Sequence, residues 1–403
     1  MQARGVGRSV TGTEREFNED SFLIDDELGL YVLADGIGGR SCGEIASAVT
    51  VRSISSYVAD KESVLERIKN KEADEQEATK LAEEAVQYAC EELQRNIETH
   101  RDCAVMGSTV TLVIVLGKKA VMAHVGNTRL YLYRNGSIHQ LSNDHTIPAE
   151  YLRRGIIGED EISNHPYKKV LTRSIGRQTS VIVDTLLFDI LPKDKLLLCS
   201  NGLNLPIDEP LKIGSALSGD LALAPDKLID LALVTEDSDD ATVVVIEPDM
   251  SIFGALKPQL TSFMPDAYFD LLGSVSIFKG LSLSQLQRIR NISRIFFFDP
   301  GEVIVEEKQP ALGMYLVLEG SVDSYMGTAK YRELRVGDYA LENMLLQTNL
   351  SGVTLKARER TRVLVLERSQ FEKFTRKHPQ IGVTLMNHIA ERLAEQLGES
   401  RSQ

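Results

Sequence analysis

The chain has 403 residues, of which 43% are hydrophobic and 26% charged, and its net charge is −13 at pH 7. This length predicts two domains, because single hydrophobic cores stop growing beyond about 250–300 residues. The acidic balance argues against a nucleic-acid partner, since neutralising phosphates needs a basic face, but it is compatible with cation binding. No apolar run reaches the ~18 residues of a membrane span and the first residues lack a signal-peptide pattern, so we expect a cytoplasmic protein with no membrane partner.

Short β-type runs dominate the first half of the chain, with Gly, Asn and Asp between them. These runs are Phe22–Asp25, Leu30–Ala34, Thr109–Leu116, Lys119–His124, Arg129–Tyr133, Lys195–Cys199 and Thr242–Ile246. Two helical patterns interrupt them, one beginning near Gly43 and one over residues 75–99. Strands, a helix pair and further strands are typical of a layered α+β domain.

A weakly patterned, proline-containing stretch follows the last of these strands and marks the domain boundary. We therefore predict a first domain over residues 1–248, a linker over 249–262 and a second domain over 263–403.

The second domain begins with a predicted helix over Leu281–Ile292 and continues in short strands separated by glycine turns, as in a small β-roll. The strands are Ile295–Phe298, Glu302–Glu306, Met314–Leu318, Tyr331–Leu334, Gly352–Ala357 and Val363–Leu366. A terminal amphipathic helix is predicted to stop at Gly398. Its apolar face could form the seam of a homodimer or pack on its own β-roll.

The four cysteines, Cys42, Cys90, Cys103 and Cys199, are widely spaced and contain no CxxC pair. We expect all four to be reduced thiols of a cytosolic protein.

Three acidic segments stand beside turns at the ends of strands. They are Asn18–Asp20, Ala34–Gly39 and Ser238–Thr242. Carboxylates at strand ends, followed by glycines that let backbone carbonyls approach, suit hard divalent cations. Any one segment alone is more often a solvated turn, so the prediction of a cation site depends on the set.

The set, extended by further motifs in the same order, resembles the metal-dependent protein phosphatases of type 2C (PPM). The further motifs are Gly107–Thr109, His124–Arg129, Leu141–Thr146, Leu171–Gly176 and Cys199–Leu203. This resemblance covers residues 5–247 and implies an α-β-β-α sandwich with two Mn²⁺ or Mg²⁺ ions at one end. It implies a bacterial-style enzyme that hydrolyses phosphoserine and phosphothreonine in phosphoproteins, the substrates of a Ser/Thr kinase.

The resemblance also implies roles for individual residues. Asp35 would bridge the two ions and the Gly36 carbonyl would bind one of them. Glu19 and Asp20 would belong to the same cluster, and Asp239 would hold the other ion. Arg15 falls where a bidentate guanidinium pairs with the substrate phosphate. Two ions about 4 Å apart would generate a hydroxide nucleophile and offset phosphoryl charge.

Two positions depart from the family pattern. Asn201 and Asn127 stand where the family usually has Asp, the first at a metal ligand and the second at a weaker third-metal site. An amide oxygen brings no negative charge, so Asn201, whether natural or introduced, should weaken one metal site, and the pair should abolish the third. The alternative function is therefore a catalytically weak pseudophosphatase that acts as a phosphoprotein-binding scaffold.

Four further segments lie in the second half of the chain: Phe278–Ser282, Asp299–Ile304, Leu316–Val322 and Val336–Tyr339. With them, residues 268–398 resemble the cyclic-nucleotide-binding domains, which implies a regulatory β-roll with flanking helices. Glu342 matches the glutamate of that family's phosphate cassette, but Leu341 replaces a glycine and Ser351 aligns with the arginine that holds the cyclic phosphate. Because a missing charge partner penalises recognition, we expect regulation or dimerisation rather than nucleotide binding.

Overall fold

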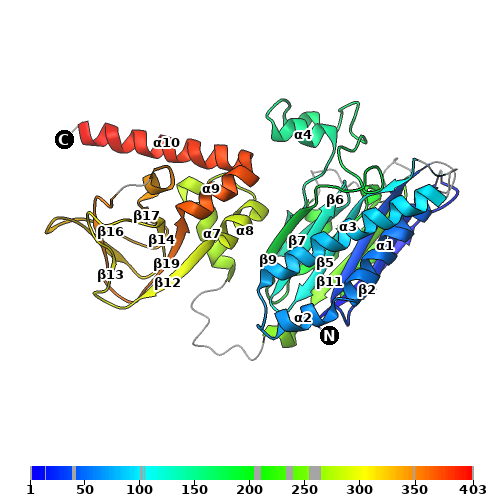
Figure 1. The fold of residues 1–403 in the computed structure, drawn as a ribbon, viewed down its shortest axis with the longest axis horizontal. Coiled ribbons are helices and arrows are strands. Elements are labelled where there is room, and N and C mark those ends of the chain that lie inside the picture. The colour runs from blue at the N-terminus through cyan, green and yellow to red at the C-terminus, as the bar shows by residue number, and fades with distance from the viewer. Residues whose placement is uncertain are drawn as a thin grey trace. The chain divides into compact units, whose positions relative to one another are not determined.

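The computed structural model describes residues 2–13, 15–38, 42–99, 103, 105–203, 210–232, 239–253, 265–347 and 350–401. The chain divides into two compact units, Met1–Leu256 and Lys257–Gln403, each with its own core (Figure 1). The division falls within the predicted linker. Among the described helices, none combines the length and apolar character that crossing a membrane requires.

Two antiparallel sheets form the centre of the first unit. One has the strand order β1-β11-β10-β7-β8, and the other has the order β2-β3-β5-β6-β9 with β4 paired to β3. The strands of the first sheet are β1 (Ala3–Val10), β7 (Arg129–Arg134), β8 (Ser137–Gln140), β10 (Lys195–Cys199) and β11 (Ala241–Pro248). Those of the second are β2 (Asp20–Asp25), β3 (Leu30–Ile37), β4 (Gly107–Ser108), β5 (Val110–Leu116), β6 (Lys119–Val125) and β9 (Asp184–Asp189).

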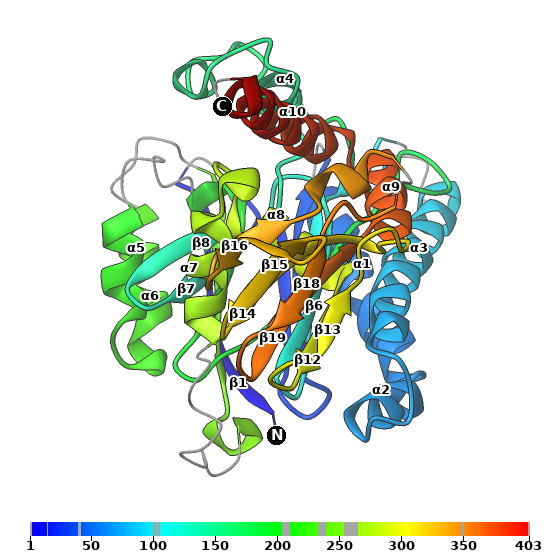
Figure 2. The same ribbon diagram turned by 90° about the vertical axis from the view of Figure 1, so that its left-hand side faces the viewer.

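Helices cover the outer face of each sheet, on opposite sides of the strands (Figure 2). Helices α1 (Cys42–Ala59) and α3 (Glu75–Thr99) pack on the second sheet, and α5 (Pro210–Leu217) and α6 (Ala224–Ala232) pack on the first. Two shorter helices are α2 (Glu62–Lys69) and α4 (Ile147–Arg153). The four layers confirm the predicted α-β-β-α sandwich.

The alternation of side chains along β3 shows why the layers form. Leu30, Val32 and Ala34 join the core beneath α1 and α3, while Tyr31, also buried, points to the other sheet. A Cβ at Gly5 of β1 would lie 2.6 Å from the Tyr31 ring, so the two sheets meet at this point. Strands buried on both faces are hydrophobic throughout, which explains the apolar runs in the sequence.

The second unit is a β-roll of two four-stranded sheets, ordered β12-β19-β14-β17 and β13-β18-β15-β16. Its strands are β12 (Ser293–Phe298), β13 (Val303–Val305), β14 (Gly313–Glu319), β15 (Val322–Met326), β16 (Ala329–Leu334), β17 (Tyr339–Ala340), β18 (Thr354–Ala357) and β19 (Thr361–Glu367). Its helices are α7 (Pro265–Ser274), α8 (Leu283–Asn291), α9 (Arg368–Lys377) and α10 (Pro379–Arg401). The predicted β-roll with flanking helices is confirmed.

The terminal helix α10 ends later than predicted. Of the two predicted roles for its apolar face, a dimer seam or packing on its own β-roll, the structure shows the second. It continues through Gly398 to Arg401, because a glycine inside a helix costs only about 1 kcal/mol. Ile381, Leu385 and Ile389 are buried in the unit's own core. This face therefore packs internally, and a homodimer, which stays a prediction, would need another surface.

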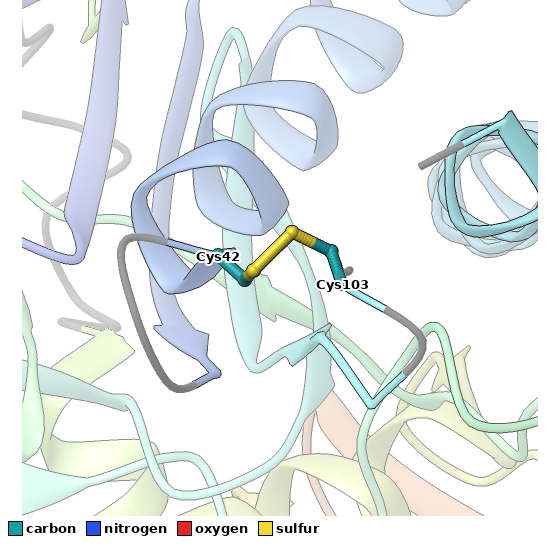
Figure 3. The surroundings of a disulfide bond; sticks show 2 residues. All are labelled: Cys42 and Cys103. Atoms are coloured by element: carbon teal, nitrogen blue, oxygen red, sulfur yellow. A yellow bond between two sulfur atoms is a disulfide. The ribbon is translucent and has the colours of Figure 1, made fainter. Parts of the chain in front are cut away.

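The prediction of four reduced thiols is wrong for one pair, because Cys42 and Cys103 form a disulfide with a Cα–Cα distance of 5.6 Å (Figure 3). The two residues are 61 positions apart, but β4 pairs with the end of β3 and brings Cys103 to the start of α1. Cys90 and Cys199 are buried free cysteines.

Candidate metal centre

The predicted acidic residues meet where β2 begins and β3 ends. Asp20 and Asp35 are register partners in this antiparallel pair, and the Gly36 N–H donates to the Glu19 carbonyl oxygen at 2.9 Å. Asp239 lies two residues before β11, whose first residue pairs with the last residue of β1. The chain between β1 and β2 therefore carries Arg15 and Glu19 to the same end of the sandwich as Asp239.

Arg15 connects two of these carboxylates. Its guanidinium donates to Glu19 Oε2 at 2.6 Å and to Asp239 Oδ1 at 2.7 Å, while 41% of the side chain remains exposed. A planar fork that binds two carboxylates can also bind two oxygens of one phosphate.

Asp240 is a residue of this site that the sequence analysis did not single out. Its Oδ1 accepts from the Gly12 N–H at 2.9 Å and its Oδ2 from the Glu19 N–H at 2.7 Å, and it is 3% exposed. The carboxylate thus fixes both ends of the loop that carries Arg15. A second carboxylate beside Asp239, directly before an apolar strand, was the available signal.

Crowded carboxylates shift the acid–base properties of the site. Burial raises the pKa of Asp20 to about 7, and repulsion from Asp240 and Asp239 adds to the effect. Burial, followed by repulsion from Asp20 and Asp239, holds the pKa of Asp35 well above its usual value. Such a cluster is stabilised by cations, which remove both penalties at once.

Further observations test whether the residues fit metal ions. Within the described residues, Asp20 Oδ2 and Asn127 Oδ1 are buried oxygens without a hydrogen-bond partner. A Cβ at Gly36 would overlap the Gly43 carbonyl oxygen, so only glycine allows this close backbone approach. No three His, Cys, Asp or Glu side chains of the described ranges already converge as a metal site, and Arg15 lies between two of the carboxylates instead. The donor set fits hard cations.

The two asparagines also lie beside the cluster. Asn201 follows β10, and a Cβ at the adjacent Gly202 would overlap the Asp240 carbonyl oxygen. Asn127 lies in the turn after β6, where a Cβ at Gly126 would lie 2.5 Å from Thr109, whose N–H donates to the Asp35 carbonyl oxygen at 2.8 Å.

A partly buried network of polar side chains supports this turn. The His145 Nδ1 accepts from the Gly126 N–H at 3.0 Å, and its Nε2 lies 3.3 Å from Asp184 Oδ2. Arg173 donates to the other oxygen of Asp184 at 2.8 Å. The hydrogen bond from His145 and the charge of Arg173 lower the pKa of Asp184 despite its burial. His145 and Arg173 belong to two of the family motifs in the sequence, but Asp184 was not predicted.

In the second unit, the two cassette residues are buried. Glu342 opens a short 3₁₀ turn and is 4% exposed, and Ser351 is 2% exposed with its Oγ donating to the Val353 carbonyl oxygen at 2.6 Å. Leu341 adopts a left-handed conformation with φ 63° and packs in the interior of the β-roll. The position expected for a phosphate-binding arginine thus holds a serine with local partners.

Comparison with known proteins identifies the first unit. Residues 7–218, more than half of the chain, match the protein phosphatase 2C family. The chain therefore belongs to the protein phosphatase 2C family. A serine/threonine phosphatase, stp, of Listeria monocytogenes is 31% identical over 252 residues, which are 60% of this chain and 95% of that protein.

Solved structures agree with the family assignment of this phosphatase. The serine/threonine phosphatase PstP/Ppp of Mycobacterium tuberculosis superposes with a TM-score of 0.54 at 28% identity, covering 61% of this chain and 99% of that one. The catalytic domain of PstP in complex with two manganese ions gives a TM-score of 0.52 at 27% identity, covering 61% and 98%. Residues 295–378 match the cyclic nucleotide-binding domain family, so the phosphatase carries such a domain in its second unit.

Proposed function

We propose that this phosphatase uses two Mn²⁺ or Mg²⁺ ions to hydrolyse phosphoserine and phosphothreonine in proteins, the products of a Ser/Thr kinase. The observation that carries the proposal is the juxtaposition of the Asp20–Asp35 pair with Glu19 and Asp239 around the guanidinium of Arg15. A cytoplasmic location stays a prediction.

The chain's own residues divide into metal ligands and a phosphate ligand. Asp35, the Gly36 carbonyl, Asp239 and the Asn201 amide would hold the ions, with Glu19 and Asp20 completing the cluster. Bound ions would supply a hydroxide nucleophile and offset the charge of the phosphoryl oxygens.

Arg15 has a separate task. Because it is partly exposed, it can exchange its carboxylate partners for the substrate phosphate once cations neutralise Glu19 and Asp239. The two hydrogen bonds to Asp240 keep its loop in place during this exchange. The phosphate would then be oriented by a bidentate contact at the mouth of the site.

The experiment that tests this function is hydrolysis of p-nitrophenyl phosphate by the purified chain in Mn²⁺. We expect activity that a chelator removes and that Asp35→Asn abolishes. Activity that survives the chelator or the loss of the Asp35 carboxylate would exclude the proposed mechanism.

The second candidate function is a phosphoprotein-binding scaffold with little turnover. The observation that favours it is Asn201, because an amide ligand contributes no charge to a cluster whose other members are carboxylates.

For the second unit, we propose regulation or dimerisation without a cyclic nucleotide. The interior of the β-roll is filled by its own apolar side chains, including Leu341, Met344 and Leu355. Ser351 supplies no charge for a cyclic phosphate, and Glu342 is already buried. Calorimetric titration with cyclic AMP and cyclic GMP should detect no binding at micromolar concentrations. Tight binding would mean that a nearby arginine holds the phosphate instead.

A further inference from the structure

The Cys42–Cys103 disulfide joins the two segments that flank the metal-binding end of β3. Cys42 is the first residue of α1, which follows β3, and Cys103 precedes β4 (Figure 3). Strand β4 in turn pairs with the last residues of β3, Gly36 with Ser108 and Ile37 with Gly107. The bond therefore links the segment that follows Gly36 in the chain to the segment that pairs with Gly36.

Direct contacts connect both of these segments, here called the two arms, to the proposed ligands. On the first arm, Gly43 follows Cys42 and lies so close to Glu19 that a Cβ there would overlap the Glu19 carboxylate. On the second arm, Ser108 Oγ donates to the Asp35 carbonyl oxygen at 3.1 Å and the Thr109 N–H donates to it at 2.8 Å. A shift of either cysteine thus moves groups that touch Glu19 or Asp35.

The two sulfurs differ in their surroundings. Cys42 is 5% exposed and belongs to the core beneath α1, whereas Cys103 is only partly buried and packs at the edge of that core. An external thiolate therefore reaches the sulfur of Cys103 first. The departing sulfur of Cys42 would lie at the N-terminus of an 18-residue helix, whose free N–H groups favour a thiolate.

We infer that this disulfide stabilises the metal centre and that its reduction weakens metal binding, an inference that rests on the proposed function. A dithiol reductant, as a small molecule or a protein, attacks Cys103 Sγ, and Cys42 leaves as a thiolate that takes up a proton. The second thiol of the reductant then attacks the mixed disulfide and frees Cys103, so two electrons pass from the dithiol to the protein. Opening the bond loosens the chain on both sides of Gly36 and weakens metal binding.

The test compares Mn²⁺ affinity of the full chain in its oxidised and reduced forms by calorimetry. Alkylation under denaturing conditions, read by mass, defines the forms, because two of the four cysteines should react before reduction and all four after it. We expect reduction by dithiothreitol, removed before titration, to weaken Mn²⁺ binding by about tenfold, as loss of supporting contacts does at other metal sites.

Matched variants locate the effect. The double variant Cys42→Ser/Cys103→Ser should bind Mn²⁺ like the reduced protein and ignore dithiothreitol, while Cys90→Ser should keep the full redox response. Equal affinity in the two wild-type forms, both folded by circular dichroism, would overturn the inference even if the double variant does not fold. Four reactive thiols after treatment with oxidised glutathione would overturn it too. The titration contains no substrate, so it measures Mn²⁺ binding independently of hydrolysis. A protein whose Mn²⁺ affinity depends on the disulfide but which hydrolyses no phosphate would contradict only the proposed function.

Discussion

Asn201 is the residue whose chemistry bears most directly on the strength of the metal centre. Replacing the amide by a carboxylate adds a negative charge to the proposed donor set, so Asn201→Asp should bind Mn²⁺ at least about tenfold more tightly and raise activity in limiting Mn²⁺. Calorimetry and a hydrolysis assay measure both effects. Asn135→Asp, an exposed turn residue with positive φ, adds the same charge elsewhere and should change neither.

The outcome at position 201 separates the two candidate functions. Strong activation of a nearly inactive wild type would support the scaffold, with Asn201 as the cause of its weak turnover. A wild type that already turns over well and gains nothing would dismiss the pseudophosphatase, and it would also show that our view of Asn201 as a weakening ligand is wrong.

His124 makes the stability of the first unit depend on pH. Burial, reinforced by the neighbouring His145, lowers its pKa to about 3, whereas an unfolded histidine titrates near 6.5. Below pH 6.5 the unfolded state therefore binds a proton that the folded state does not, and stability falls as pH decreases towards about 3. The slope from this group approaches 1.4 kcal/mol per pH unit. Urea unfolding followed by circular dichroism between pH 5 and 7 should be less pH-dependent in His124→Gln, and an unchanged slope would contradict this account.

Carboxylate residues next to turns could be predicted as metal ligands from the sequence. The residues that hold the site's loops and turns in place through hydrogen bonds could not. Asp35 and Asp239 stand at strand ends in recognisable segments. Asp240 and Asp184 were missed because their roles depend on partners 228 and 39 positions away, the N–H of Gly12 and the ring of His145. Only the folded chain brings such partners together.

Among the elements, β1 shows why one strand escaped prediction. Its sequence alternates glycine and arginine with small residues rather than presenting an apolar run. Gly5 and Gly7 are needed because a Cβ at either position would lie within 2.8 Å of the rings of Tyr31 or Phe22. The strand therefore forms by pairing with β11, not by local propensity.

The terminal helix allows a sharp test of its packing. Leu385 and Ile389 are 2% and 0% exposed in the core of the second unit, so Leu385→Glu/Ile389→Glu should unfold that unit, at a cost above about 4 kcal/mol. Val383 and Met386 are 57% and 42% exposed on another face of the helix, and their replacement by Glu should be tolerated. Thermal unfolding by circular dichroism distinguishes the two variants. Folded monomers derived from a wild-type dimer by the core substitutions would instead favour a dimer seam.

At the scale of the whole molecule, the sequence predicted both the family and the order of the two units. That prediction depended on a series of motifs in a fixed order rather than on any single motif. The matched ranges 7–218 and 295–378 lie on either side of the division between the units. The disulfide could not be anticipated, because four cysteines at irregular spacing do not indicate which pair the fold brings together.

Metal-dependent dephosphorylation by this end of the sandwich is the central claim. The most direct measurement is phosphate release from a phosphothreonine peptide by the full chain as a function of Mn²⁺ concentration, with Asp35→Asn alongside. We predict a saturable dependence on Mn²⁺ in the wild type and no release above background in the variant. Equal release by both proteins, or release by the wild type that does not depend on Mn²⁺ or Mg²⁺, would contradict the claim.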